Sequence, residues 1–274
     1  MEFLTDSLKE VVSKLSENQK EEIDAIESIV NTNEENKENT KEKLFHFIEK
    51  RKPENCISFI IGCIEHATKI RPKERESLLF LLTSVFNNFH LNFEIFKRFD
   101  VLMNMLQVKN ILPSGKYTYK HIFDFSEEGT IGRAIFEDNI ELLQQLLADH
   151  PDEGKEEIFY IRNFFPFNEQ FTKYKANRIE VAALFGSIKC FKYLMMNGDE
   201  INEDTCKFAV AGGNIEIIHL CEQKGLQFED CLFISTLYHR FEIFEWLNTH
   251  FEYEEINLSK FIKHYNEPLF YFNT

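Results

Sequence analysis

The sequence predicts an all-α fold, in which a helical N-terminal region precedes a solenoid of helical repeats. Four segments share one pattern: a helix of small residues, a glycine or polar break, and then a leucine-rich helix. Apolar residues within each segment follow the spacing of a helix and not the period of two that a strand requires. Internal repetition indicates that each unit buries its apolar face against its neighbours.

The repeat units become clear when they are aligned on the break between their two helices. One apolar position is shared by all four units and is occupied by Ile140, Ile188, Ile215 and Phe241. The interval from Ile188 to Ile215 is 27 residues, and the interval from Ile215 to Phe241 is 26. The interval from Ile140 to Ile188 is 48, so a segment of about 20 residues is inserted between the first two units.

The elements expected along the N-terminal region are all helical. Residues 2–30 form one or two amphipathic helices, and the polar stretch 31–40 forms a loop. Four more helices are expected at Glu42–Lys50, Pro53–Ala67, Arg71–Asn88 and Asn92–Leu106. We therefore predict a helical N-terminal region at 1–122 and degenerate repeats at 123–274. The repeat units are expected near 130–150, 176–198, 204–225 and 230–250, with a C-terminal cap at 257–274.

The turn inside each unit calls for a residue that tolerates positive φ. Glycine has no Cβ and adopts this conformation freely, and Gly186 and Gly213 occupy the turn in the second and third units. Asp138 and His239 occupy the same position in the first and fourth units. The first and fourth units therefore match the pattern less well than the second and third, because glycine is expected at this turn.

The second unit resembles the ankyrin-repeat family. It carries the family's Ala-Ala-x-x-Gly turn at 182–186 and a leucine-rich helix followed by glycine at 193–198. The opening Thr-Pro-Leu-His signature is missing from every unit, and the repeats are shorter than the family's period of about 33 residues. This shortening leaves open whether β-hairpin fingers project between the units.

The region before the repeats resembles the leader helices of the large, divergent ankyrin-like families of anaerobic protists. The resemblance rests on residues 67–74, on the leucine-rich stretch 78–82, and on the joining stretch 127–130. Such a family implies a protein–protein interaction scaffold or adaptor. Two alternatives remain: a structural protein that self-associates, and a cysteine-dependent enzyme of an unrecognised kind.

The charge balance limits the classes of partner. The formal net charge is −15, and a surface of this sign repels the phosphates of nucleic acids and the anionic face of membranes. We expect an unidentified protein partner, and a basic one is the natural complement. The alternative is that the acidic residues keep a phenylalanine-rich chain soluble. The oligomeric state does not follow from the sequence.

The sequence shows no pattern of a catalytic, cofactor or metal site. Its 6 cysteines include no Cys-x-x-Cys pair, and the phosphate-binding, dinucleotide-binding and zinc-protease motifs are missing. The N-terminus lacks the pattern of a signal peptide, and no apolar run reaches the ~18 residues of a membrane span. We therefore predict a non-enzymatic protein without cofactors, located in the cytoplasm, with the nucleus as the alternative.

Two sets of residues are candidates for contact with a partner. In ankyrin-like stacks the outer position of each first helix borders the concave groove, and this position holds Gly132, Glu180, Lys207 and Phe233. The insertion between the first two units carries an aromatic run that includes Phe164, Phe165 and Phe167. This run is either an exposed anchor for a partner or a segment that folds back over the helices.

Overall fold

The computed structural model describes residues 5–51, 53–113, 120–156, 159–161, 175–228 and 231–251. These residues form two compact units, one N-terminal to Phe123 and one that starts at Asp124. The predicted all-α fold with helical repeats is confirmed, since the described residues are mostly helical and form only one short two-stranded sheet. The cap expected at 257–274 lies outside the described residues.

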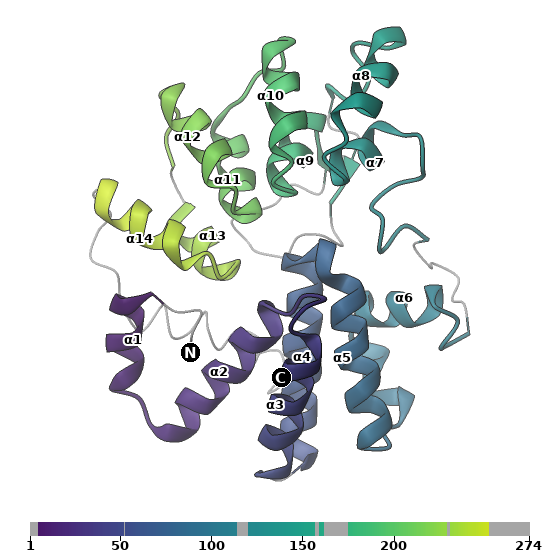
Figure 1. Ribbon diagram of the computed structural model, residues 1–274, viewed down its shortest axis with the longest axis vertical. Coiled ribbons are helices and arrows are strands. Elements are labelled where there is room, and N and C mark those ends of the chain that lie inside the picture. The colour runs from purple at the N-terminus through teal and green to yellow at the C-terminus, as the bar shows by residue number, and fades with distance from the viewer. Residues whose placement is uncertain are drawn as a thin grey trace. The chain divides into compact units, whose positions relative to one another are not determined.

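The N-terminal unit is an assembly of short helices around the long helix α4. Its elements are α1 (Asp6–Ser13), α2 (Glu17–Val30), α3 (Lys37–Glu49), α4 (Pro53–Ile70), the 3-10 turn η1 (Pro72–Glu74), α5 (Arg75–Asn88), the 3-10 turn η2 (Phe93–Arg98) and α6 (Asp100–Val108). Helices α2, α3, α5 and α6 all pack against α4. Figure 1 shows α3 and α5 beside α4. The core of this unit is mainly aliphatic, with Ile29, Leu44 and Ile60 fully buried, and it also includes the fully buried ring of Phe96.

The loop predicted at 31–40 is shorter than expected, because α3 already begins at Lys37. Its polar sequence forms a helix through local pairs, which include the Lys37–Glu34 and Lys41–Glu38 ion pairs. The ammonium groups of these two lysines also lie 5.2 and 5.6 Å from the centre of the Phe80 ring on α5. Tertiary contacts of this kind are not visible in a local polar pattern.

A buried carboxylate fixes the start of α6. The Glu65 side chain on α4 accepts hydrogen bonds from the amides of Val101 and Leu102 at 3.3 and 2.9 Å. These amides lie in the first turn of α6, where backbone donors have no partner inside the helix and negative charge is favourable. The helix predicted at Asn92–Leu106 is therefore divided into η2 and α6, and α4 caps the second part.

In its described residues, the compact unit that starts at Asp124 contains four helix pairs, in the order that the repeat alignment predicts. The pairs are α7 (Ile131–Phe136) with α8 (Ile140–Asp149), α9 (Arg178–Leu184) with α10 (Ile188–Met196), α11 (Glu203–Gly212) with α12 (Ile215–Gln223), and α13 (Cys231–Leu237) with α14 (Phe241–His250). The first helices pack side by side in chain order, α7 on α9, α9 on α11, and α11 on α13 (Figure 1). The second helices follow the same order from α8 to α10 to α12.

The turn between the helices of each pair has the same backbone conformation in all four units. The residue two positions before the second helix has positive φ in every case: 53° at Asp138, 63° at Gly186, 80° at Gly213 and 52° at His239. Few residues other than glycine adopt positive φ. Its occurrence at the same aligned position in all four units therefore shows that the four turns are structurally equivalent. The alignment of Asp138 and His239 with the two glycines is confirmed.

Neighbouring units are joined by a repeated hydrogen bond from the residue that precedes each second helix. Ser187 donates to the carbonyl of Ile135 at 2.6 Å, and Asn214 donates to the carbonyl of Gly186 at 3.1 Å. Arg240 donates to the carbonyl of Gly212 at 2.7 Å. Each bond reaches back to the end of the first helix, or to the turn, of the preceding unit, where carbonyls lack helical partners. Three different residue types thus perform one structural task.

The first two repeat units are also joined by the buried side chain of Arg178. Arg178 binds Asp199 in a bidentate manner, with Nε–Oδ2 and Nη2–Oδ1 distances of 2.7 and 2.6 Å. The two side chains are 1% and 3% exposed. The remaining guanidinium nitrogen donates to the carbonyls of Pro151 and Glu153 at 2.8 and 2.7 Å. One arginine therefore holds together the segment after α8, the start of α9 and the segment after α10.

Candidate functional site

Of the four outer positions predicted for partner contact, two are buried and two reach the surface. Glu180 is fully buried, and its carboxylate accepts a hydrogen bond from the amide of Asn177 at 2.9 Å. Asn177 in turn caps the amide of Glu180 at 3.0 Å, which completes a capping box at the start of α9. The assignment of Glu180 to a binding surface was wrong, because its side chain stabilises the helix start and reaches no solvent.

The outer position of the first repeat unit is also inaccessible to a partner. Gly132 is buried, and a Cβ added there would lie 3.0 Å from the Cβ of Ser126. Every residue of α9 from Arg178 to Leu184 is buried. The outer face of the first helices is therefore covered at α7 and α9, and an open groove along the full row is not formed.

Lys207 and Phe233 are the two members of the row that reach the surface. Both are half-buried, and they lie on α11 and α13, which pack against each other. The Lys207 ammonium lies 3.6 Å from the carboxylate of Asp204, one turn earlier on α11. This part of the surface combines a cation, a carboxylate and an aromatic ring, a combination that is common where proteins bind proteins.

The aromatic insertion is described only at its two ends. Strand β1 (Phe159–Tyr160) pairs antiparallel with β2 (Lys175–Ala176), with Phe159 opposite Ala176. The Phe159 ring lies 6.0 Å from the ring of Phe125, and Phe125 contacts Phe185 at 4.7 Å in an edge-on arrangement. This end of the insertion folds back onto the first two units. The candidate anchors Phe164, Phe165 and Phe167 lie outside the described residues.

The cysteines have the environment of core residues. All six are free and buried. Burial raises the pKa of the Cys63 thiol, and a hydrogen bond with the Cys221 thiol, together with burial, raises that of Cys206. A nucleophilic cysteine needs the opposite shift, since the thiolate is the reactive form. Within the described ranges, no group of three or more His, Cys, Asp or Glu side chains is placed to hold a metal ion.

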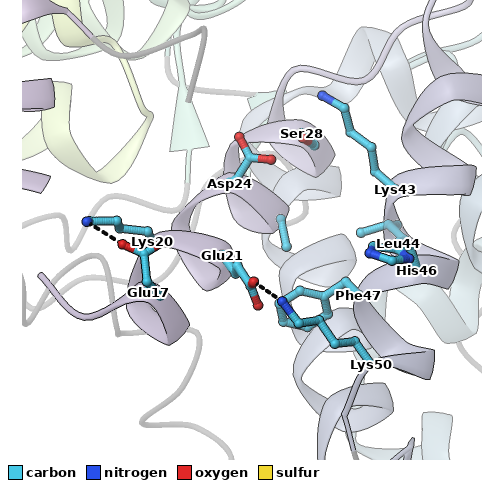
Figure 2. Close-up of a pocket in the computed structure, with 11 residues that line it drawn as sticks. Glu17, Lys20, Glu21, Asp24, Ser28, Lys43, Leu44, His46, Phe47 and Lys50 are labelled. Atoms are coloured by element: carbon cyan, nitrogen blue, oxygen red, sulfur yellow. Dashed lines mark hydrogen bonds and ion pairs between the residues drawn. The ribbon is translucent and has the colours of Figure 1, made fainter. Parts of the chain in front are cut away.

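A second surface feature lies in the N-terminal unit and was not anticipated from the sequence. A groove with a volume of about 320 Å³ lies between α2 and α3. Figure 2 shows Glu21 of α2 and Lys50 of α3 joined by an ion pair. The hydrogen bond from Lys50 lowers the pKa of Glu21, and Arg51 adds a second contact at 2.9 Å. The residues of α2 that line the groove recur at helical spacing. This pattern can be recognised as one wall of a groove only when α3 is known to lie opposite.

The comparison with protein families covers the later repeats. Residues 196–273 match DUF3447, a domain of unknown function. Of the described residues, this match contains α11 to α14 and therefore both Lys207 and Phe233. The searches of curated proteins and of solved structures found no match. Among the described helices, none is both long enough and apolar enough to cross a membrane.

Proposed function

We propose that this chain is an ankyrin-like, non-enzymatic scaffold that binds a partner protein through the surface of α11 and α13. The observation that carries the proposal is the equivalence of the four helix pairs, each with a positive-φ turn and linked to its neighbour by one repeated hydrogen bond. Stacks of this kind present extended surfaces that proteins use for binding. The matched family, DUF3447, is known in ankyrin-repeat proteins, which supports the ankyrin-like assignment.

The proposed partner is a protein with a basic segment. The chain carries a formal charge of −15. Its electrostatic field therefore orients a basic partner and makes it associate faster than a neutral one. Glu203 and Asp204 lie in the first turn of α11, close along the helix to Lys207. The partner would thus place cationic side chains against this turn and an apolar side chain against Phe233. Free, buried thiols support a location in a reducing compartment such as the cytoplasm, with the nucleus as the alternative.

The test is affinity capture from native lysate with three forms of the full chain, quantified by mass spectrometry. The first form is wild type, and the second carries Asp204→Lys with Phe233→Ala, which removes an anion and the aromatic ring from the proposed surface. The third is a matched control, Glu222→Lys with Leu226→Ala, which makes the same kinds of change at the end of α12 and just after it. Thermal unfolding followed by circular dichroism identifies any variant that is merely unstable.

The proposal predicts a protein that wild type and the control retain and that the α11/α13 variant loses. Equal retention by all three forms would exclude this surface as the binding site. A wild-type chain that retains no protein at all would contradict the scaffold function itself.

A further inference from the structure

The turn that follows α10 contains the only Asn-Gly pair in the sequence, at Asn197 and Gly198. Both residues are exposed, and Met196 before them is 82% exposed. The side-chain amide of an asparagine can react with the backbone nitrogen of the next residue. Glycine hinders this reaction least, because it has no Cβ. The pair is therefore a candidate for spontaneous covalent modification.

The turn has the geometry of a Schellman motif, in which the residues after a helix bond back to its last turn. Gly198 has a φ of 88°, a conformation that glycine adopts without strain. The amide of Asp199 donates to the carbonyl of Leu194 at 3.1 Å, and the amide of Gly198 donates to the carbonyl of Met195 at 3.4 Å. These two bonds set the path of the chain from α10 to Asp199.

The two groups that would react are held by weak or local contacts. The bond from the Gly198 nitrogen, at 3.4 Å, is longer than the usual 2.7–3.2 Å, and a Cβ added to Gly198 would meet nothing within 4 Å. The Asn197 side chain donates through Nδ2 to the carbonyl of Tyr193 at 2.7 Å, within the last turn of its own helix. Helix ends fray, and opening of this turn frees both groups together.

We propose that Asn197 is a site of spontaneous deamidation. The Gly198 nitrogen gives up its proton and bonds to Cγ of Asn197, while the Cγ–Nδ2 bond breaks and the amide group leaves with that proton as ammonia. Water then opens the resulting cyclic imide at either of its two carbonyls. One opening gives aspartate, and the other gives isoaspartate, in which the main chain runs through the side-chain carbons. Water is the co-reactant, so the conversion proceeds without an oxidant or an enzyme.

Both products disturb the end of α10. Aspartate places a negative charge at the C-terminus of the helix, where the helix dipole disfavours it, and lacks the amide that donates to Tyr193. Isoaspartate also lengthens the main chain by one carbon directly before Gly198. The amides of Gly198 and Asp199 then shift along the chain relative to α10, and the two bonds of the Schellman motif are lost.

Asp199 connects this turn to the buried junction between the first two repeat units. Its carboxylate binds Arg178 at 2.7 and 2.6 Å, and the two side chains are 3% and 1% exposed. A buried ion pair offsets the cost of desolvation only when its geometry is good. Displacement of Asp199 by an extra main-chain atom therefore weakens the pair, and formation of isoaspartate loosens the contact between these two units. The proposal does not depend on binding at the α11/α13 surface.

The test follows the full chain during incubation at physiological temperature, in the native state and unfolded in urea. Peptide mapping by mass spectrometry measures the conversion of amide to acid at each asparagine, and synthetic reference peptides separate aspartate from isoaspartate. Asn248 is the internal control, because it is also exposed but precedes Thr249, whose side chain hinders the attack. Asn197→Gln is the control variant, since its longer side chain forms the corresponding ring far more slowly.

In the native chain, conversion at Asn197 should exceed that at Asn248 at least tenfold, and it should accelerate with pH because the attacking nitrogen must lose its proton. It should be roughly tenfold slower than in urea, because the turn must first open. A native Asn197 that stays intact after the unfolded chain has converted would overturn the proposed site. Equal conversion at Asn197 and Asn248 in the native chain would also overturn it.

The structural consequence has its own measurement. The chain that has formed isoaspartate should unfold at a lower urea concentration than the fresh chain, whereas Asn197→Asp should shift the midpoint less, since its main chain is unchanged. The shift should be smaller in an Arg178→Met background, where the ion pair is already absent. If Arg178→Met does not fold, the comparison with Asn197→Asp still decides. Equal stability of the fresh and converted chains would refute the link to Arg178.

Discussion

The hydroxyl of Ser187 donates a hydrogen bond to the main-chain carbonyl of Ile135 across 2.6 Å, and so joins the second helix pair to the first. Ser187 is fully buried and lies directly before α10. Asn214 and Arg240 make the corresponding bond in the next two units. The register of the stack is thus fixed by one polar position in each of the last three repeat units, in addition to the packing of the apolar faces.

Ser187→Ala should lower the free energy of unfolding by about 1 kcal/mol. The Ile135 carbonyl keeps the bond from the Asp138 amide, so the loss is that of one buried hydrogen bond and not of a fully orphaned group. Urea denaturation followed by circular dichroism measures the change. Ser13→Ala serves as the control, because the hydroxyl of Ser13 bonds only its own exposed helix. An equal change in both variants would show that the bond between units contributes nothing specific.

Gly186→Val should destabilise the chain by about 1 kcal/mol or more, because a β-branched residue is strained at the φ of 63° found there. Steric room is not the cause, since an added Cβ would lie 3.5 Å from that of Asn214, an ordinary contact. The cost should decrease from valine to alanine to asparagine, which tolerates positive φ best. Thermal unfolding of the three variants tests this order, and equal stability would show that the turn is not constrained.

The sequence identified the helix pairs and their turns because apolar spacing and glycine are local signals. It did not reveal that Asp138, in the turn of one unit, accepts a hydrogen bond from the amide of Cys190 in the next at 2.9 Å. The role of Glu180 was visible in principle, since Asn177-x-x-Glu180 is a capping-box pattern. The position of Glu180 on the helix, taken alone, predicts a surface residue instead. The α2/α3 groove depends on two helices meeting, which no local pattern specifies.

Arg178→Met should be among the most damaging substitutions, with a loss of about 3–5 kcal/mol. It leaves the Asp199 carboxylate, 3% exposed, without its partner and also removes two partly buried hydrogen bonds to the carbonyls of Pro151 and Glu153. Adding Asp199→Asn removes the unpaired charge and should recover part of the loss. A double-mutant cycle by chemical denaturation measures the coupling. Strict additivity of the two losses would mean that the pair is not coupled in the folded state.

Glu180→Ala should lower stability by about 1 kcal/mol, the usual worth of a helix cap. The variant removes the acceptor for the Asn177 amide and half of the capping box of α9. Glu203→Ala is the matched control, since Glu203 is exposed in the first turn of α11. A stability loss confined to Glu180→Ala would assign this residue to the fold. Unchanged stability in both variants would contradict the capping role.

The cysteines should be unreactive in the folded chain. Burial raises the pKa of Cys56 and Cys63, and Cys206 is shifted in the same direction by its hydrogen bond with Cys221. A raised pKa keeps these three thiols protonated, so raising the pH from 7 to 8.5 should increase their labelling in the native chain far less than it does for an exposed cysteine, whose pKa is about 8.5. Labelling with a chromogenic disulfide should give few thiols natively and all 6 in guanidinium. One thiol that reacts rapidly in the native chain at pH 7 would revive the cysteine-dependent enzyme and count against a purely binding role.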